Sequence, residues 1–194
     1  MAVKLPAFAP GERRHLPDLM RTLFGNDDVR IGFVMLFACR EGSDCTQCDA
    51  DCRRITARAR VFTTDAEGKT YGQLVPGVPS QSLHGPDDRV FLTGIRQTGA
   101  FRTNVGLLNA SEQAETTLRL RLHDASGERG VYEQRLPPLA FVQGSVAAMF
   151  PGFTGEGWIA IESGSMAPFL AFASMIDNAS NDPVYLESQV EGAR

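Results

Sequence analysis

Four cysteines are the residues whose type and spacing most clearly suggest chemistry. They are all the cysteines of the chain, and they follow the pattern C-x5-C-x2-C-x3-C from Cys39 through Cys45 and Cys48 to Cys52. If the flanking segments form a hairpin, Cys39 and Cys52 can approach within the roughly 4 to 7 Å between Cα atoms that a disulfide requires. Cys45 and Cys48 would then close the tip, so the spacing predicts two nested disulfides.

A structural zinc site is the alternative for the same four thiols. Structural zinc is bound by sets of four cysteines with similar short spacers. Disulfides persist in exported proteins, and a β-rich exported chain favours disulfides over zinc. We therefore predict no resident cofactor, with zinc at the cysteines as the minor alternative.

The histidines do not form a recognisable catalytic motif. His15, His84 and His123 are far apart in the sequence, and none stands beside a serine, a cysteine or an acid in a nucleophile motif. A triad can be assembled from distant residues, but we expect these histidines at the surface or in turns. The chain is therefore predicted not to be an enzyme.

Arg102, Asn104 and Trp158 are the candidate ligand contacts. Arg102 and Asn104 stand two apart in an expected strand and therefore point to the same face, where they could bind a polar ligand or pair with the backbone of a neighbouring loop. Trp158, together with Phe153, could form an aromatic platform for a sugar. A single tryptophan beside Gly157 in a strand is more typical of a core, so both interpretations of Trp158 stay open.

Three oxygen-bearing side chains, those of Asp177, Asn178 and Asp182, surround one expected turn. Such oxygens can ligate calcium. Asp and Asn side chains also stabilise turns by bonding nearby backbone N–H groups, and turn chemistry is the preferred interpretation.

Composition and charge narrow the class of partner. The chain has 194 residues, of which 43% are hydrophobic, and its net charge is −4 with both signs mixed along its length. This composition fits a folded protein and lacks the basic field that attracts nucleic acid. The longest apolar run, near residues 31–38, is too short to cross a bilayer. We therefore expect no nucleic acid partner and no membrane span.

The elements that must position these residues are mostly strands. Residues 89–111 predict two strands joined by a tight turn at Thr98–Ala100, and a short helix is expected over residues 17–24. Residues 136–150 predict a proline-led connection with a short helical piece. Alternating or apolar runs predict further strands at residues 29–40, 54–64, 70–75, 116–124, 131–136, 157–163 and 167–177.

The sequence also shows internal similarity between two of its segments. Residues 57–71 align with residues 171–185 without a gap, as strand, turn, strand and tyrosine, and residues 32–35 align with residues 157–160. Self-similarity at a long period is typical of tandem copies of one supersecondary unit. Strands like those of residues 89–124 precede only the second copy. The first copy is therefore predicted to be incomplete and to leave an apolar face and an open edge.

Three pieces of the chain carry a family resemblance. They are FRTNVGLLNASEQAETTLRLRLHDASGERG at 101–130, LPPLAFVQ at 136–143 and ITARARVFTTDAEGKTYGQLVPGVP at 55–79. These pieces resemble an uncharacterised β-sandwich repeat that recurs in large secreted and cell-surface bacterial proteins, and the resemblance covers most of residues 5–187. It implies a non-catalytic module next to other domains, with half of one repeat followed by one whole repeat. The cysteine loop is a departure from typical copies.

The sequence therefore predicts an all-β fold of Ig-like antiparallel β-sandwich units, one partial and one complete, with one or two short helices. Residues 1–79 would form the incomplete unit with its cysteine-rich hairpin insertion, residues 80–88 a linker, and residues 89–190 the complete unit. We expect a secreted or cell-surface module that spaces or presents other domains, or that binds a protein partner or another copy of the chain through open sheet edges. The alternative is a carbohydrate- or peptide-binding module with a groove near Trp158 or the cysteine loop.

Overall fold

The computed structural model describes residues 9, 11–25, 32–38 and 55–192. The chain divides into two compact units, residues 1–55 and residues 56–194. The strands between residues 58 and 76 therefore belong to the same unit as the strands that follow them. The three-part division predicted from the sequence, with boundaries after residues 79 and 88, stays a prediction.

The first unit contains α1 (Leu19–Phe24), which confirms the helix expected over residues 17–24. The Asp18 side chain accepts a hydrogen bond from the Arg21 N–H at 3.3 Å and so caps the first turn. Gly25 follows the helix with a φ of 59°, a conformation that a residue without Cβ adopts most easily. The helix thus begins and ends at residues whose types specify its boundaries.

The prediction of a buried strand at residues 29–40 is wrong for its described part, residues 32–38. These residues form no strand, and Val34, Leu36 and Phe37 are 44%, 43% and 41% exposed. An apolar run becomes buried only where another layer covers it. The composition of the run does not specify that layer.

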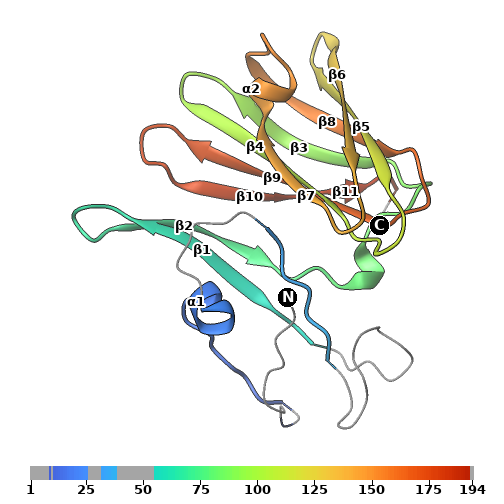
Figure 1. Ribbon diagram of the computed structural model, residues 1–194. Helices are drawn as coiled ribbons and strands as arrows, with labels where there is room; N and C mark the ends of the chain where they lie inside the picture. Colours follow the sequence, from blue (N-terminus) through green and yellow to red (C-terminus); the bar gives the residue numbers. More distant parts are fainter. Residues whose placement is uncertain (1–8, 10, 26–31, 39–54, 193–194) are drawn as a thin grey trace. The chain divides into compact units, whose positions relative to one another are not determined.

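The second unit consists of antiparallel strands arranged as two larger sheets and one separate hairpin (Figure 1). Its strands are β1 (Arg58–Thr64), β2 (Thr70–Pro76), β3 (Val90–Gln97), β4 (Phe101–Asn109), β5 (Thr116–Asp124), β6 (Gly127–Leu136), β7 (Phe141–Ser145), β8 (Gly155–Ser163), β9 (Phe169–Asp177), β10 (Pro183–Glu187) and β11 (Gln189–Val190). The four-stranded sheet has the order β10-β9-β4-β7, and the five-stranded sheet has the order β11-β3-β8-β5-β6.

The core lies between the two larger sheets. In β5, Leu118, Leu120 and Leu122 are fully buried, while Arg119 and Arg121 alternate with them on the outward face. Each fully buried leucine contributes about 2 kcal/mol relative to an exposed one. The inward residues of the neighbouring strands and of the α2 region complete the core, and they are Val90, Leu92, Ile95, Val105, Leu107, Leu136, Val146, Met149, Phe150, Phe153, Ile159, Ile161, Phe169, Ala171 and Ala173. The fold is the predicted all-β antiparallel sandwich.

The two strands predicted within residues 89–111 are present, but they do not form a hairpin. β3 pairs with β8 and β11, whereas β4 pairs with β9 and β7 in the other sheet. The turn at residues 98–100, which the Thr98 N–H closes by donating to the Phe101 carbonyl at 2.7 Å, therefore carries the chain from one sheet to the other. Thr103 connects the layers at this end, because its Oγ1 donates to the Arg96 carbonyl at 2.7 Å.

The connection expected over residues 136–150 contains a strand as well as a helix. The short helix α2 (Val146–Met149) confirms the helical piece, and Ser145 caps it by accepting from the Ala148 N–H at 3.2 Å. β7 precedes it and pairs with β4. The stretch before β3 contains the 3-10 turn η1 (Ser80–Ser82) and a bridge between His84 and Phe169.

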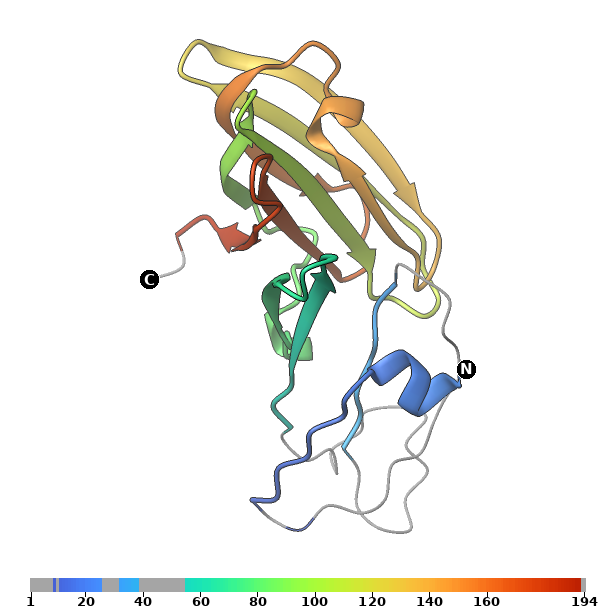
Figure 2. The ribbon, with the colours of Figure 1, turned by 90° about the vertical axis from the view of Figure 1, so that its left-hand side faces the viewer.

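β1 and β2 form a two-stranded antiparallel sheet of their own, and β2 lies beside β10 of the four-stranded sheet (Figures 1 and 2). Asp65 organises its turn. Oδ1 of Asp65 accepts from the N–H groups of Glu67 and Lys69 at 2.9 and 2.8 Å, and Oδ2 accepts from the Tyr71 hydroxyl at 2.9 Å. These bonds lower the pKa of Asp65 against the opposing effect of burial, which is the largest single influence on that pKa.

An aspartate caps both the β1–β2 turn and the β9–β10 turn. The surroundings of the two turns differ, however, from those that the internal similarity of the sequence predicts. Asp177 accepts from two backbone N–H groups of its turn, as Asp65 does in the other turn. The ungapped overlay pairs Tyr71 with Tyr185. The Tyr71 hydroxyl donates to Asp65, whereas the Tyr185 ring stacks on Phe172 at 5.4 Å. The overlay is therefore wrong at its tyrosines, and the tandem-copy interpretation stays a prediction.

Two features expected from the sequence concern the cysteines and the membrane. The segment with Cys39, Cys45, Cys48 and Cys52 lies outside the described residues, so the disulfide and zinc hypotheses stay predictions. Among the helices of the described residues, none has the length and apolar character that crossing a bilayer requires.

Candidate functional site

The outward face of the four-stranded sheet presents its side chains in rows that cross the strands. Successive rows from the β9–β10 turn, on β10, β9 and β4, are Pro183–Ile176–Arg102, Tyr185–Ser174–Asn104 and Glu187–Phe172–Gly106. Arg102 and Asn104 thus point to the same face, as their spacing predicts. This face is the floor of the candidate site.

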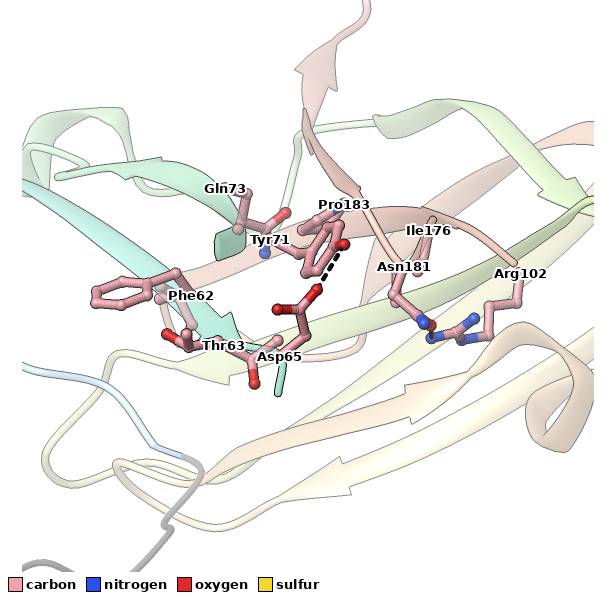
Figure 3. A pocket seen from close by; sticks show the side chains of 12 residues that line it. Phe62, Thr63, Asp65, Tyr71, Gln73, Arg102, Ile176, Asn181 and Pro183 are labelled. Atoms are coloured by element: carbon pink, nitrogen blue, oxygen red, sulfur yellow. Dashed lines mark hydrogen bonds between the residues drawn. The ribbon is translucent and has the colours of Figure 1, made fainter. Parts of the chain in front are cut away.

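The β1–β2 hairpin encloses a cleft with this face. The two parts meet where Ser174 Oγ donates to Gln73 Oε1 at 3.0 Å, and β2 lies beside β10. The cleft has a volume of about 550 Å³. It is lined by residues 61–65 and 71–73 of the hairpin and by Arg102, Ile176, Asn181 and Pro183. Figure 3 shows Arg102 and Asn181 at one end of the labelled group and Phe62 at the other.

β1 forms the open side of the cleft. Val61 and Phe62 are 59% and 54% exposed, whereas the opposite side closes at the bond between Gln73 and Ser174. The Arg60 guanidinium lies 4.9 Å from the centre of the Phe62 ring and donates to Thr70 Oγ1 at 2.9 Å, so it orients that ring. A ligand in the cleft would therefore contact an accessible strand on one side and a sheet face on the other.

Two asparagines of the β9–β10 turn hold Arg102. Its Nη1 donates to Asn178 Oδ1 at 2.7 Å, and its Nη2 donates to Asn181 Oδ1 at 3.1 Å. Asn178 Nδ2 donates in turn to the Gly99 carbonyl at 3.1 Å. Arg102 thus contacts the side chains of this loop rather than its backbone. Asn178 and Asp177 are candidate calcium ligands in the sequence. The Asn178 Oδ1 accepts from Arg102, and the Asp177 Oδ1 accepts from the Ala179 and Ser180 N–H groups of the turn.

Arg102 differs from the other arginines of residues 80–192. Those others are each within ion-pair distance of a carboxylate, and they are Arg89, Arg96, Arg119, Arg121, Arg129 and Arg135. Arg102 alone in this range is held by neutral amide oxygens. Its positive charge is therefore fixed in position without being neutralised, which is the arrangement of an anion receptor.

Asn104 lies outside the lining of the cleft. It occupies the next row of the sheet face, paired with Ser145 of β7 and Ser174 of β9. Beyond it, the Phe172 ring lies over Gly106, where a Cβ would be only 2.3 Å from the ring. Burial, reinforced by the charge of Glu187, raises the pKa of Tyr185 to about 12, so this hydroxyl stays protonated at neutral pH.

Trp158 lies on the outward face of the five-stranded sheet, on the opposite side of the sandwich from Arg102. The His123 ring stacks on the indole with centroids 4.1 Å apart and planes at 6°, and the Phe91 ring meets it at 5.6 Å and 61°. The side chain is 36% exposed. Because His123 occupies one face of the indole and Phe91 packs beside it, the ring is engaged in cross-strand packing. Phe153, the proposed partner of Trp158, is buried in the core.

His84 is the titratable group that the sequence reasoning misplaced. It is only 5% exposed rather than at the surface, and its Nε2 lies 2.7 Å from Ser188 Oγ. Burial lowers the pKa of His84, although the charges of Asp88 and Glu187 oppose that shift. The Asp88 carboxylate accepts from the Gly85 N–H at 2.7 Å, and none of the described carboxylates bonds to the imidazole. The histidine and serine are therefore not oriented as the catalytic triad of a hydrolase.

Sequence reasoning identified Arg102 but missed the residues that complete the site. Asn178 and Asn181 are 76 and 79 residues away from Arg102, and Gln73 is 101 residues away from Ser174. The one local signal was the cluster of Asp and Asn at the expected β9–β10 turn. That cluster indicates a turn but does not indicate which side chain reaches it.

Comparisons with known proteins assign no function to this site. No protein-family model matches the chain, and no curated protein matches it. A solved structure described as the crystal structure of Thermotoga maritima 1070 is similar over 56% of this chain and 94% of that chain, with 16% sequence identity and a TM-score of 0.43.

Proposed function

We propose that this chain is a non-catalytic extracellular interaction module that binds an extended segment of a partner protein as an added strand on β1. In this mode of recognition, backbone hydrogen bonds to a free sheet edge supply affinity, and pockets for alternate side chains supply specificity. The cleft beside β1 would receive those side chains.

The outer backbone edge of β1, which pairs with no other strand among the described residues, is the observation that carries this proposal. The Asp65 N–H donates to the Lys69 carbonyl and the Gly77 N–H donates to the Ala57 carbonyl, both at 2.9 Å. In an antiparallel pair, residues that exchange such bonds alternate with residues whose N–H and C=O groups point outward. The register then directs the backbone groups of the even-numbered residues of β1 away from β2.

β1 lacks the features that usually protect an edge strand. Such strands are blunted by proline, bulges or a covering element, whereas the β1–β2 register is regular over all seven residues of β1, and every one of them is exposed. The outer edge of β2 carries Pro76, which has no N–H to donate. A two-stranded hairpin alone is marginally stable in water. A third strand added to β1 would therefore stabilise the hairpin as well as bind the partner.

The extracellular part of the proposal rests on the resemblance to secreted bacterial repeats and on the cysteine spacing. In that setting the module would present or space neighbouring domains while β1 holds the partner. Carbohydrate binding is the weaker candidate, because the indole of Trp158 is engaged by His123 and Phe91.

Selection of peptides on the purified chain, followed by hydrogen exchange, tests strand addition. A random library of short peptides displayed on phage supplies the probe, and the strongest binder is synthesised. Its binding should slow exchange at the amides of Arg60, Phe62 and Thr64, which point outward, because each gains a backbone acceptor. The amides of Val61 and Thr63 already bond to β2 and should change little.

Substitution of Thr64 separates edge pairing from other modes of binding. Thr64→Pro removes one outward N–H without touching a bond to β2, so peptide affinity should fall at least about fivefold. Thr64→Val keeps the N–H and serves as the matched control, with unchanged affinity. If peptide binding leaves exchange at the outward amides unaltered, or if both variants bind alike, strand addition on β1 is wrong.

A further inference from the structure

We infer that the cleft recognises a carboxylate of the bound segment, and that Arg102 is the residue that binds it. This inference rests on the proposed function, since the segment that adds to β1 would carry the carboxylate. It goes further by naming the chemistry of the ligand: an extended peptide with an acidic side chain at the Arg102 end of the cleft.

The charge of Arg102 is the first argument. Every arginine between residues 80 and 192 except Arg102 forms an ion pair with a carboxylate. The exception lies in the lining of the cleft. An external carboxylate would supply the missing negative charge.

The orientation of Arg102 is the second argument. A mobile arginine loses side-chain entropy when a ligand fixes its guanidinium in one geometry. This loss weakens a surface ion pair. Asn178 and Asn181 already hold Arg102 through two hydrogen bonds, and the Asn178 amide is itself anchored to Gly99. Since the guanidinium has five N–H donors and these bonds use two of them, donors remain for a ligand.

The distribution of charge along the cleft gives the recognition a direction. Asp65 lines the cleft together with Arg102, but both of its oxygens are occupied, by the N–H groups of Glu67 and Lys69 and by the Tyr71 hydroxyl. Asp65 would repel an acidic side chain beside it. The carboxylate of the segment must therefore lie beside Arg102 rather than beside Asp65, while an apolar side chain contacts Val61.

Paired peptides and paired variants test the inference. The selected peptide is compared with a version in which its acidic residue is replaced by the matching amide, on the full chain and on Arg102→Gln. Affinity should fall about tenfold when either charge is removed, and removing the second should cause little further loss. Arg121→Gln, which removes an arginine paired with Glu128 on the other sheet, should bind like the unaltered chain.

Two further measurements keep the result interpretable. Thermal unfolding of Arg102→Gln confirms that the variant is folded, and Arg102→Lys, which keeps the charge but not the planar fork, should bind with intermediate affinity. Titration of the unaltered chain with glutarate, followed by the NMR signal of the Arg102 Nε–H, examines the carboxylate site without any strand. A shift of that signal that saturates is expected.

The outcomes separate this inference from the proposed function. If peptides protect the outward amides of β1 but tolerate loss of their acid or of Arg102, carboxylate recognition is overturned and strand addition stands. If glutarate shifts the Arg102 signal while no peptide adds to β1, the carboxylate site is supported and the proposed function fails. If a selected peptide shows neither effect and glutarate leaves Arg102 unchanged, both are overturned.

Discussion

Asn109 shows how completely one buried side chain can be bonded in this sandwich. Its Nδ2 donates to the carbonyls of Ala114, Leu136 and Pro137 at 2.8, 3.1 and 3.0 Å, and its Oδ1 accepts from the Ser111 N–H at 2.9 Å. The side chain is fully buried. Since an unpaired buried polar group costs about 1 to 3 kcal/mol, Asn109 fixes the end of β4, the loop after it and the end of β6 together.

His84 should make the stability of the second unit depend on pH. Burial lowers the pKa of His84 in the folded state below the value of 6.5 that an unburied histidine has. The unfolded chain therefore binds a proton that the folded chain does not. The contribution of neutral His84 to the free energy of unfolding should be fully present above pH 6.5, and it should decline as the pH falls below that value. The slope of this contribution is at most about 1.4 kcal/mol per pH unit. Urea unfolding across this pH range measures it.

Two histidine variants identify the source of that decline. His84→Gln, which removes the titrating group, should flatten the pH dependence between pH 6.5 and the acid limit of folding. His15→Gln changes an exposed histidine in the other unit and should keep the decline of the unaltered chain. An equal slope in His84→Gln and the unaltered chain would show that the burial of His84 does not produce the effect.

At the residue scale, the sequence predicted positions better than contacts. The spacing of Arg102 and Asn104 indicated a shared face, because strand periodicity is a local property. The bonds of Arg102 to the β9–β10 turn, and the contact between His84 and Ser188, join residues that only the assembled sheets bring together. For the same reason the sequence places His84 at the surface or in a turn, although its ring is buried and packs on Phe169.

Individual strands were predictable, but their assignment to sheets was not. The alternation in β5 and β6 and the apolar runs of β8 and β9 indicate strands because each places one face in the core. β3 and β4 carry the same signals as a hairpin, and the partners that separate them, β8 and β9, are distant in the sequence. β7 was missed because its five residues follow two prolines and precede α2, so no alternation becomes apparent.

Gly106 of β4 allows the aromatic row on the outward sheet face to form. A Cβ at this position would lie 2.3 Å from the Phe172 ring, which is stacked between Phe141 and Tyr185 at 6.2 and 5.4 Å. Because the ring has neighbours on both sides, Gly106→Ala should lower the free energy of unfolding by about 1 to 3 kcal/mol. The midpoint of urea unfolding measures the change.

Gly99→Ala is the matched control for this substitution. A Cβ at Gly99 meets nothing within 4 Å, and its φ is not positive. Its effect should stay within about 0.5 kcal/mol. Similar losses for the two variants would mean that the close approach of Phe172 is not what requires glycine at position 106.

At the scale of the whole molecule, the two compact units differ in how their sequence relates to structure. In the second unit, local patterning, turn residues and long-range pairing agree, and such agreement is typical of a well-specified fold. In the described part of the first unit, the apolar residues 34–37 are exposed and residues 32–38 form no strand. Apolar patterning therefore predicts strands correctly in the second unit and fails at residues 32–38, although α1 of the first unit is present as expected.

The cysteine cluster gives a prediction that concerns the compartment of the whole protein. If the chain is secreted, as its resemblance implies, it should show no free thiol in denaturant and four thiols after reduction, with no bound zinc. Thiol titration together with metal analysis measures this. Four thiols without reductant and one equivalent of zinc would instead indicate a metal-folded loop.

The pairing within the cluster is tested by a single substitution. Cys45→Ser should leave the thiol of Cys48 alone reactive toward an alkylating agent, because Cys39 and Cys52 would still be bonded to each other. Peptide mapping identifies the labelled residue. Label on Cys39 or Cys52 would show a different connectivity.

The pairing of β11 with β3 determines how this sandwich would behave inside a longer polypeptide. Val190 lies opposite Val90, the Glu191 N–H donates to the Arg89 carbonyl at 2.9 Å, and the two side chains form an ion pair at 3.0 Å. The chain thus leaves the sandwich beside the point where it arrived. Between residues 89 and 191 the sandwich would therefore add little end-to-end distance to a filament or stalk, and it would present a neighbouring domain from the side rather than space it along the axis. Tension along the stalk would peel β11 from β3 one bond at a time, leaving the sandwich suited to display rather than to bearing load.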